Sequence, residues 1–111
     1  MKTSNKIINL PNDFTKFTGL RYESLTEGIS GERFREEFLI PALDEFESIT
    51  VVFDGNIGEY LPSFLEECFG GLIRKKKYSL EEFNKVIKIV SEDDPSIITD
   101  IIYYVQNEIN K

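Results

Sequence analysis

A nearly apolar run in the middle of the chain, residues 49–54 with the sequence ITVVFD, decides much about the fold. The run is rich in β-branched residues, and Gly55 follows it directly. A strand with apolar side chains on both sides is typical of a sheet that helices cover on both faces. Residues 49–54 are therefore predicted to form a central strand that is buried on both faces.

Three other segments have features of strands. Ile7–Leu10 is apolar except for Asn9 and stops at Pro11, which has no amide hydrogen to donate to a ladder. Leu20–Leu25 shows a weak alternation of side chains, and Val86–Val90 has strand composition. With residues 49–54, these segments predict a mixed sheet of four to five strands.

Helix signals lie between the strands. Ser30 is a suitable N-cap, and apolar residues recur every four positions from Phe34 onward. Pro41 interrupts this stripe and predicts a kink, because it removes one backbone donor. A last helix is expected to have Asp94 as its cap and Pro95 at its first helical position.

The second main helix is predicted to begin near Ser63. Ser63 and Glu66 have the spacing of a capping box, and Ser79 and Glu82 repeat that spacing before a further short helix. Gly70-Gly71 lies within the second helix, whose apolar face continues beyond it. We therefore expect the two glycines to allow close packing against a neighbour.

The order of these elements is β, β, α, β, α, β, α, without repeats or low-complexity linkers. Alternating strands and helices indicate a sheet packed by helices. The length of 111 residues suits one domain. The sequence therefore predicts a single α/β domain over residues 1–111, with three main helices.

The amino-acid composition excludes several kinds of catalytic and metal-binding site. The sequence has no histidine, which excludes His-dependent triads and His-based metal sites. Cys68 is the only cysteine, so we expect a reducing compartment and a small buried side chain at this position. No catalytic residue, metal or cofactor is predicted.

The net charge of -7 disfavours phosphate backbones and anionic membranes as partners. The longest apolar run is too short to span a bilayer, so we expect a cytoplasmic protein that binds neither nucleic acid nor membrane. The basic run Arg74–Lys77 fits the last turn of the second helix, where cations complement the helix dipole. A partner-binding basic edge is the alternative.

The strongest candidate site is the loop between Asp54 and Ser63, which contains Gly55, Gly58 and Glu59. In open α/β sheets, ligands gather beyond the carboxyl ends of strands, near helix N-termini. Free amide hydrogens and the Ser63 hydroxyl would suit an anion or a phosphorylated serine. The alternative is that Ser63 only caps its helix, and the two acidic residues count against a tightly bound polyanion.

The exposed side of the second helix, with Glu66, Glu67 and Arg74, completes the candidate surface. Adjacent carboxylates on a helix point about 100° apart, so Glu66 and Glu67 do not converge on one substrate atom. This pattern is more typical of a solvated face or a binding surface than of an acid–base pair.

Three stretches together resemble a known family. They are Ser30-Gly31-Glu32 followed by Phe34-Arg35, then residues 50–55, and then residues 63–72. The chain resembles the STAS-like domain family of unknown function, which is related to the sulfate-transporter and anti-sigma-factor-antagonist domains. The resemblance runs from Gly19 to Ser91, and the run SFLEE ending in FGGL is its most specific part.

The resemblance implies a small mixed sheet with helices on one side. In the antagonist relatives, an ATP-dependent kinase of the GHKL type phosphorylates a serine at the start of the second helix, which switches binding to an anti-sigma factor. By position, Ser63 is the matching residue. A bacterial regulatory system, with a GHKL-type ATPase or another regulator as protein partner, is therefore implied.

We therefore predict a non-enzymatic protein-interaction or regulatory module. Two alternatives stay open, namely a nucleotide or small-anion sensor at the same loop, and a small acidic inhibitor encoded by a phage or mobile element. The second is permitted because an acidic surface can occupy a basic groove. An enzyme is disfavoured, because the chain has no histidine and no convergent pair of acids.

Overall fold

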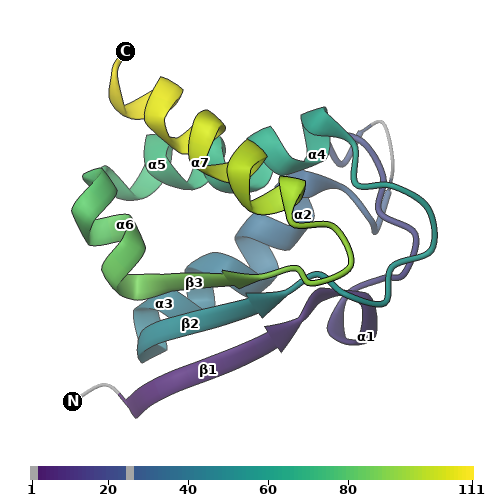
Figure 1. Ribbon diagram of the computed structural model, residues 1–111, viewed down its shortest axis with the longest axis horizontal. Helices are drawn as coiled ribbons and strands as arrows, with labels where there is room; N and C mark the ends of the chain where they lie inside the picture. The colour runs from purple at the N-terminus through teal and green to yellow at the C-terminus, as the bar shows by residue number, and fades with distance from the viewer. Residues whose placement is uncertain (1–2, 25–26) are drawn as a thin grey trace.

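The computed structural model describes residues 3–24 and 27–111. Its sheet has three strands, β1 (Thr3–Asn9), β2 (Phe46–Val52) and β3 (Ile87–Val90), in that order and all parallel (Figure 1). The predicted central strand over residues 49–54 is thus confirmed as central, although it begins earlier and ends at Val52. The expected mixed sheet of four to five strands is wrong for the described residues.

The helices include two long ones, each interrupted by a wide π-helical turn. The first long helix joins α2 (Gly31–Phe34), η1 (Arg35–Leu39) and α3 (Ile40–Glu45). The second long helix joins α4 (Pro62–Leu65), η2 (Glu66–Gly70) and α5 (Gly71–Lys76). The others are α1 (Leu10–Asp13), α6 (Leu80–Val86) and α7 (Ser96–Ile109).

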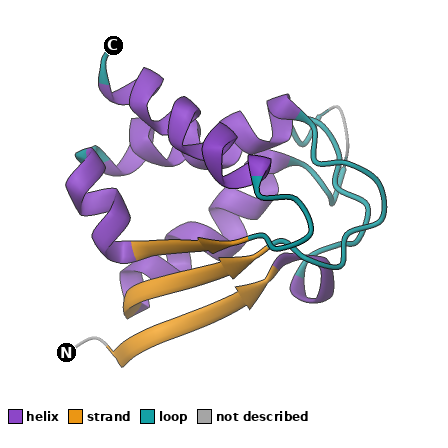
Figure 2. Cartoon of the chain, viewed as in Figure 1, coloured by secondary structure: helices purple, strands orange, loops and turns teal. Residues whose placement is uncertain are grey.

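Only one face of the sheet is covered. Ile49 and Val51 of β2 are almost fully buried, whereas Thr50 between them is only half-buried. On the same open face, Thr50 is paired with Ile7 and Lys88 of the outer strands, and both are exposed. Figure 2 shows the long helices and α7 above and behind the strands. The expected burial of both faces is therefore wrong, while the implied one-sided arrangement is present.

The predicted strand Leu20–Leu25 does not form over residues 20–24, of which 21–24 make bends and turns, and Leu25 lies outside the described residues. The carbonyl groups of Leu20 and Arg21 accept hydrogen bonds from the amides of Gly31 and Glu32, at 2.9 Å each. The segment thereby satisfies free donors in the first turn of the first long helix. Carbonyl groups that a strand would offer to a sheet are used to cap a helix.

The helix starts were predicted with mixed success. Ser30 caps the first long helix, since its hydroxyl accepts from the Arg33 amide at 3.0 Å. The capping box of Ser79 and Glu82 is also present. The last helix begins one residue later than expected, but the Asp94 carboxylate still accepts from the Ser96 amide.

The predicted capping box at Ser63 is wrong. Leu61 is the N-cap of the second long helix and makes no side-chain cap, because leucine has no polar side-chain atom, and Pro62 occupies the first helical position. Proline is favoured there since its missing amide hydrogen costs nothing. Ser63 is therefore the second helical residue, two positions beyond the cap, and Glu66 binds arginines instead.

The interruption at Pro41 takes the form of a π-helical turn directly before α3, in which the amide of Ile40 donates to the carbonyl of Arg35. Widened turns of this kind relieve the missing hydrogen bond and the crowding that a proline causes.

The two long helices approach closely where glycines face them. A Cβ atom on Gly31 would lie 2.7 Å from the backbone oxygen of Phe64. A Cβ atom on Gly71 would overlap the guanidinium of Arg35, and one on Gly70 would overlap the Glu66 carboxylate. The expected close packing against a neighbour is confirmed for Gly71, which meets Arg35 of the first long helix, whereas the side chains next to Gly70 belong to its own helix.

The Gly31→Ala variant is expected to lower the free energy of unfolding by about 1–3 kcal/mol, because the added methyl group meets backbone that cannot rotate away. Urea denaturation measures this loss. Gly70→Ala is the control, with a smaller expected loss, because the half-buried Glu66 carboxylate can move aside. Equal losses in the two variants would contradict this account of the helix contact.

Candidate functional site

The structure divides the predicted site residues between two hollows. Asp54, Gly55, Gly58 and Glu59 line a small cavity of about 100 Å³, named here the loop cavity. Glu66, Glu67 and Arg74 line a larger groove of about 590 Å³, named here the ion-pair groove. Ser63 lines neither of them.

The loop cavity lies at the carboxyl ends of β2 and β3. The Asp54 carboxylate accepts hydrogen bonds from the backbone amides of Glu92 at 3.0 Å and Asp93 at 2.7 Å, and so joins the loops that follow the two strands. Gly55 and Gly58 have positive φ angles of 100° and 88°, which favour glycine.

Carboxylates surround this cavity. Asp54, Glu59, Asp93 and Asp94 line it, and the described lining residues include no lysine or arginine. Tyr60 completes the wall, where its hydroxyl donates to the Phe53 carbonyl at 2.7 Å and burial raises the pKa of its phenol. A negative potential of this kind disfavours a phosphate or another anion.

Ser63 is half-buried near the start of the second long helix and caps nothing. Its position in the first helical turn favours negative charge through the helix dipole. Its phosphorylation stays a prediction.

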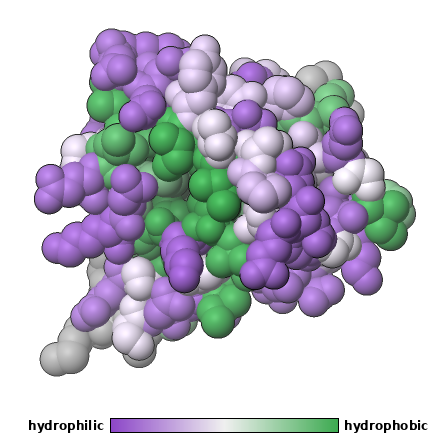
Figure 3. Space-filling view, viewed as in Figure 1, coloured by the Kyte–Doolittle hydropathy of each residue, from purple (hydrophilic) through white to green (hydrophobic). Residues whose placement is uncertain are grey.

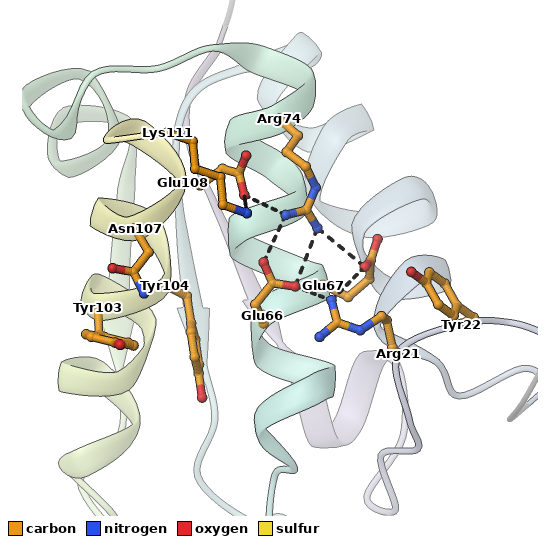
Figure 4. A pocket seen from close by; sticks show the side chains of 10 residues that line it. All are labelled: Arg21, Tyr22, Glu66, Glu67, Arg74, Tyr103, Tyr104, Asn107, Glu108 and Lys111. Atoms are coloured by element: carbon orange, nitrogen blue, oxygen red, sulfur yellow. Dashed lines mark hydrogen bonds and ion pairs between the residues drawn. The ribbon is translucent and has the colours of Figure 1, made fainter.

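The ion-pair groove is built from three separate parts of the chain (Figure 4). One wall comes from Arg21 and Tyr22, in the loop before the first long helix, and the floor comes from the second long helix. The other wall comes from the end of the chain. The residues from that wall are Tyr103, Tyr104, Asn107, Glu108 and Lys111.

Arg74 is the centre of the charged network in this groove. It donates to Glu66 at 2.9 Å and to Glu108 at 2.7 Å, and reaches Glu67 at 3.4 Å. Arg21 pairs with Glu66 and, at 3.2 Å, with Glu67 (Figure 4). The network therefore links the second long helix both to α7 and to the loop before the first long helix.

These ion pairs control the ionisation of the groove. Burial by itself would raise the pKa of Glu66, but hydrogen bonds from Arg74 and Arg21 outweigh it and hold the pKa below its ordinary value. The pKa of Glu108 is lowered in the same way, with burial opposed by Arg74 and Lys111. Both carboxylates are therefore ionised and engaged at neutral pH.

Beneath the groove lies a buried ion pair that was not predicted from the sequence. Arg35 and Glu67 are only 4% and 6% exposed, and their side chains pair directly. Arg35 also donates to the backbone carbonyl of Glu67 at 2.8 Å and to the Glu36 carboxylate at 2.8 Å. Two features of the sequence could have indicated this ion pair. One is an arginine beside the apolar stripe of the first long helix, and the other is the glycines that leave space for the pair.

Cys68 fulfils the expectation of a small buried side chain. It is fully buried beside Gly31, whose carbonyl lies 3.5 Å from its sulfur, and burial raises the pKa of its thiol. A thiol in this state is a poor nucleophile.

The described part of the chain has neither a metal-binding cluster nor a membrane-spanning helix. No group of three or more acidic or cysteine side chains there is placed to hold a metal ion. Within residues 3–24 and 27–111, no helix has the length and apolar character that crossing a bilayer requires.

A sequence model for one protein family, described as STAS-like domain of unknown function (DUF4325), matches residues 30–96. The chain belongs to this STAS-like family. The matched part begins at the N-cap Ser30, contains both long helices with β2 and β3, and ends at Ser96, the first residue of α7. A search of curated proteins and a search of solved structures found no match.

The STAS-like segment therefore carries the floor of the ion-pair groove, with Glu66, Glu67 and Arg74. Arg21 and Tyr103, which contribute to its two walls, lie outside the matched residues.

The Glu67→Gln variant is expected to lower the free energy of unfolding by about 3 kcal/mol, because it removes the charge partner of the buried Arg35. Glu66→Gln is the matched control on the next residue. Its arginine partners are about one third exposed, so we expect a loss below about 1 kcal/mol. Urea denaturation at neutral pH compares the two, and an equal or larger loss for Glu66→Gln would contradict the assigned roles.

Proposed function

We propose that this STAS-like domain is a non-enzymatic regulatory module that binds another protein through the ion-pair groove. The observation that carries the proposal is the rim of the groove, where Tyr103 and Tyr22 are 59% and 48% exposed beside Arg21 and Arg74. Tyrosine and arginine are enriched at the energetically important positions of protein interfaces.

The ion pairs prepare this rim for binding. Arg21 and Arg74 are each held by at least two carboxylates, so their side chains have already lost much of their rotational freedom. A partner that contacts fixed side chains loses less entropy on association. The groove is thus a shaped, charged surface before any partner arrives.

The same pairing favours binding over acid–base catalysis. An efficient general acid or base has a pKa near the working pH. Glu66 and Glu108 instead have lowered pKa values, and the chain has no histidine.

For the partner, we propose a GHKL-type ATPase or another regulator, in line with the relatives of the STAS-like family. Phosphorylation of Ser63 would provide a switch. A phosphate at this residue would add up to two negative charges one helical turn before Glu66, and so would change the charge next to the groove. The small, carboxylate-lined loop cavity counts against the alternative of a nucleotide or anion sensor.

A photo-crosslinking amino acid in place of Tyr103 is expected to capture a discrete partner in cells that express the protein, because this side chain stands exposed on the groove. Mass spectrometry of the crosslinked species identifies the partner. The same amino acid at Ile7, which is 63% exposed on the open face of the sheet, is the control. Capture of one set of proteins at both positions would contradict the proposal.

Incubation with a GHKL-type kinase and ATP is expected to add the mass of one phosphate to Ser63, and Ser63→Ala should prevent it. Peptide mass spectrometry locates the modification, and Ser79, whose hydroxyl is engaged in its capping box, serves as the internal control. An unmodified Ser63 would remove the phosphorylation switch and leave binding through the groove in place.

A further inference from the structure

Three large apolar side chains are exposed on loops at the carboxyl end of the sheet. Phe17 is 60% exposed, Ile57 is 55% exposed and Leu61 is 38% exposed. They are named here the loop-tip surface. In Figure 3, apolar atoms protrude at the right-hand edge of the molecule, where Figure 1 shows these loops side by side. None of the three lines the ion-pair groove.

The loops that carry this surface are held in place. The amide of Ile57 donates to the carbonyl of Lys16 at 2.9 Å, which joins the loop of Ile57 to the loop of Phe17. Gly55 lies next to Pro11 of α1, because a Cβ atom added to Gly55 would be 4.0 Å from the proline ring. A prearranged surface of this kind binds a partner with a smaller loss of entropy.

Acidic side chains accompany the apolar ones. Asp54 and Glu59 lie on the same loop as Ile57, and Asp54 joins that loop to Glu92 and Asp93 through their backbone amides. One cation is close by, namely Lys16, which directly precedes Phe17 and whose carbonyl accepts from Ile57. The loop-tip surface is therefore apolar at its tips and acidic at its side.

We propose that the loop-tip surface is a second docking site, which takes a basic amphipathic segment of a protein partner. Apolar side chains of such a segment would cover Phe17, Ile57 and Leu61, while its lysines and arginines would meet the carboxylates. Complementary charge also raises the rate of encounter and rejects acidic segments. A small acidic inhibitor of a basic protein, one of the functions that the sequence leaves open, would act through a surface of this kind.

Other occupants fit less well. Anionic membranes and nucleic acids are repelled by the carboxylates. A twofold dimer would bring the same patch of each copy together, and so would place carboxylates against carboxylates.

Fluorescence anisotropy with the full chain tests the proposal. The probe is a labelled amphipathic helical peptide of leucine and lysine, and its counterpart has glutamate in place of lysine. We expect saturable binding of the lysine peptide that weakens at high salt, and no binding of the glutamate peptide. Absence of binding by the lysine peptide, or equal binding of both peptides, would overturn the proposal.

Variants separate the loop-tip surface from general attraction to an acidic protein. Phe17→Ser and Ile57→Ser are expected to weaken binding by about tenfold. Ile7→Ser removes an equally exposed apolar side chain on the open face of the sheet and should leave binding unchanged. Glu59→Lys should weaken binding by about fivefold, and Glu45→Lys, on α3, should have a smaller effect.

Equal effects of the loop-tip variants and their controls would show non-specific binding and would overturn the proposal. Binding of the wild-type chain to anionic vesicles, lost in Ile57→Ser, would assign the surface to membranes instead. Thermal unfolding of each variant confirms that the exposed substitutions leave the domain folded.

Discussion

The buried ion pair between Arg35 and Glu67 joins the two long helices at their π-helical turns. Two buried charges are stable only when their remaining hydrogen-bonding groups are satisfied. Here Arg35 also binds a backbone carbonyl and Glu36, while Glu67 offers its other oxygen to Arg21 and Arg74. Gly71 leaves the space in which the guanidinium lies. Core and surface are thus connected through one carboxylate, and the shape of the groove depends on the helix contact below it.

Features that depend on neighbouring residues could be predicted from the sequence. The central strand, the Ser30 cap and the capping box of Ser79 each follow from a few consecutive residues. Predictions failed where distant segments compete for the same backbone groups. The carbonyl groups of residues 20 and 21 cap a helix instead of joining the sheet, and Pro62 displaces Ser63 from the cap position.

The same limit applies to the candidate site. Glu66, Glu67 and Arg74 were singled out because they lie on one helix, whereas their partners Arg21 and Glu108 are far away in sequence. Neither local spacing nor composition indicates which charges meet across such distances. The match to the STAS-like family also ends at Ser96, the first residue of α7, so it leaves out the rest of this helix. One wall of the groove is therefore built from a segment that the family assignment does not describe.

The open face of the sheet offers an experimental handle on the domain. It carries both polar and apolar side chains, since Ser48 donates to Asn5 at 2.8 Å and both Lys88 and Ile7 are exposed. This face lies away from the long helices and contributes no residue to either hollow. A fluorophore or a surface linkage attached at Lys88 therefore leaves the groove and the loops free, so the domain can be immobilised in a known orientation.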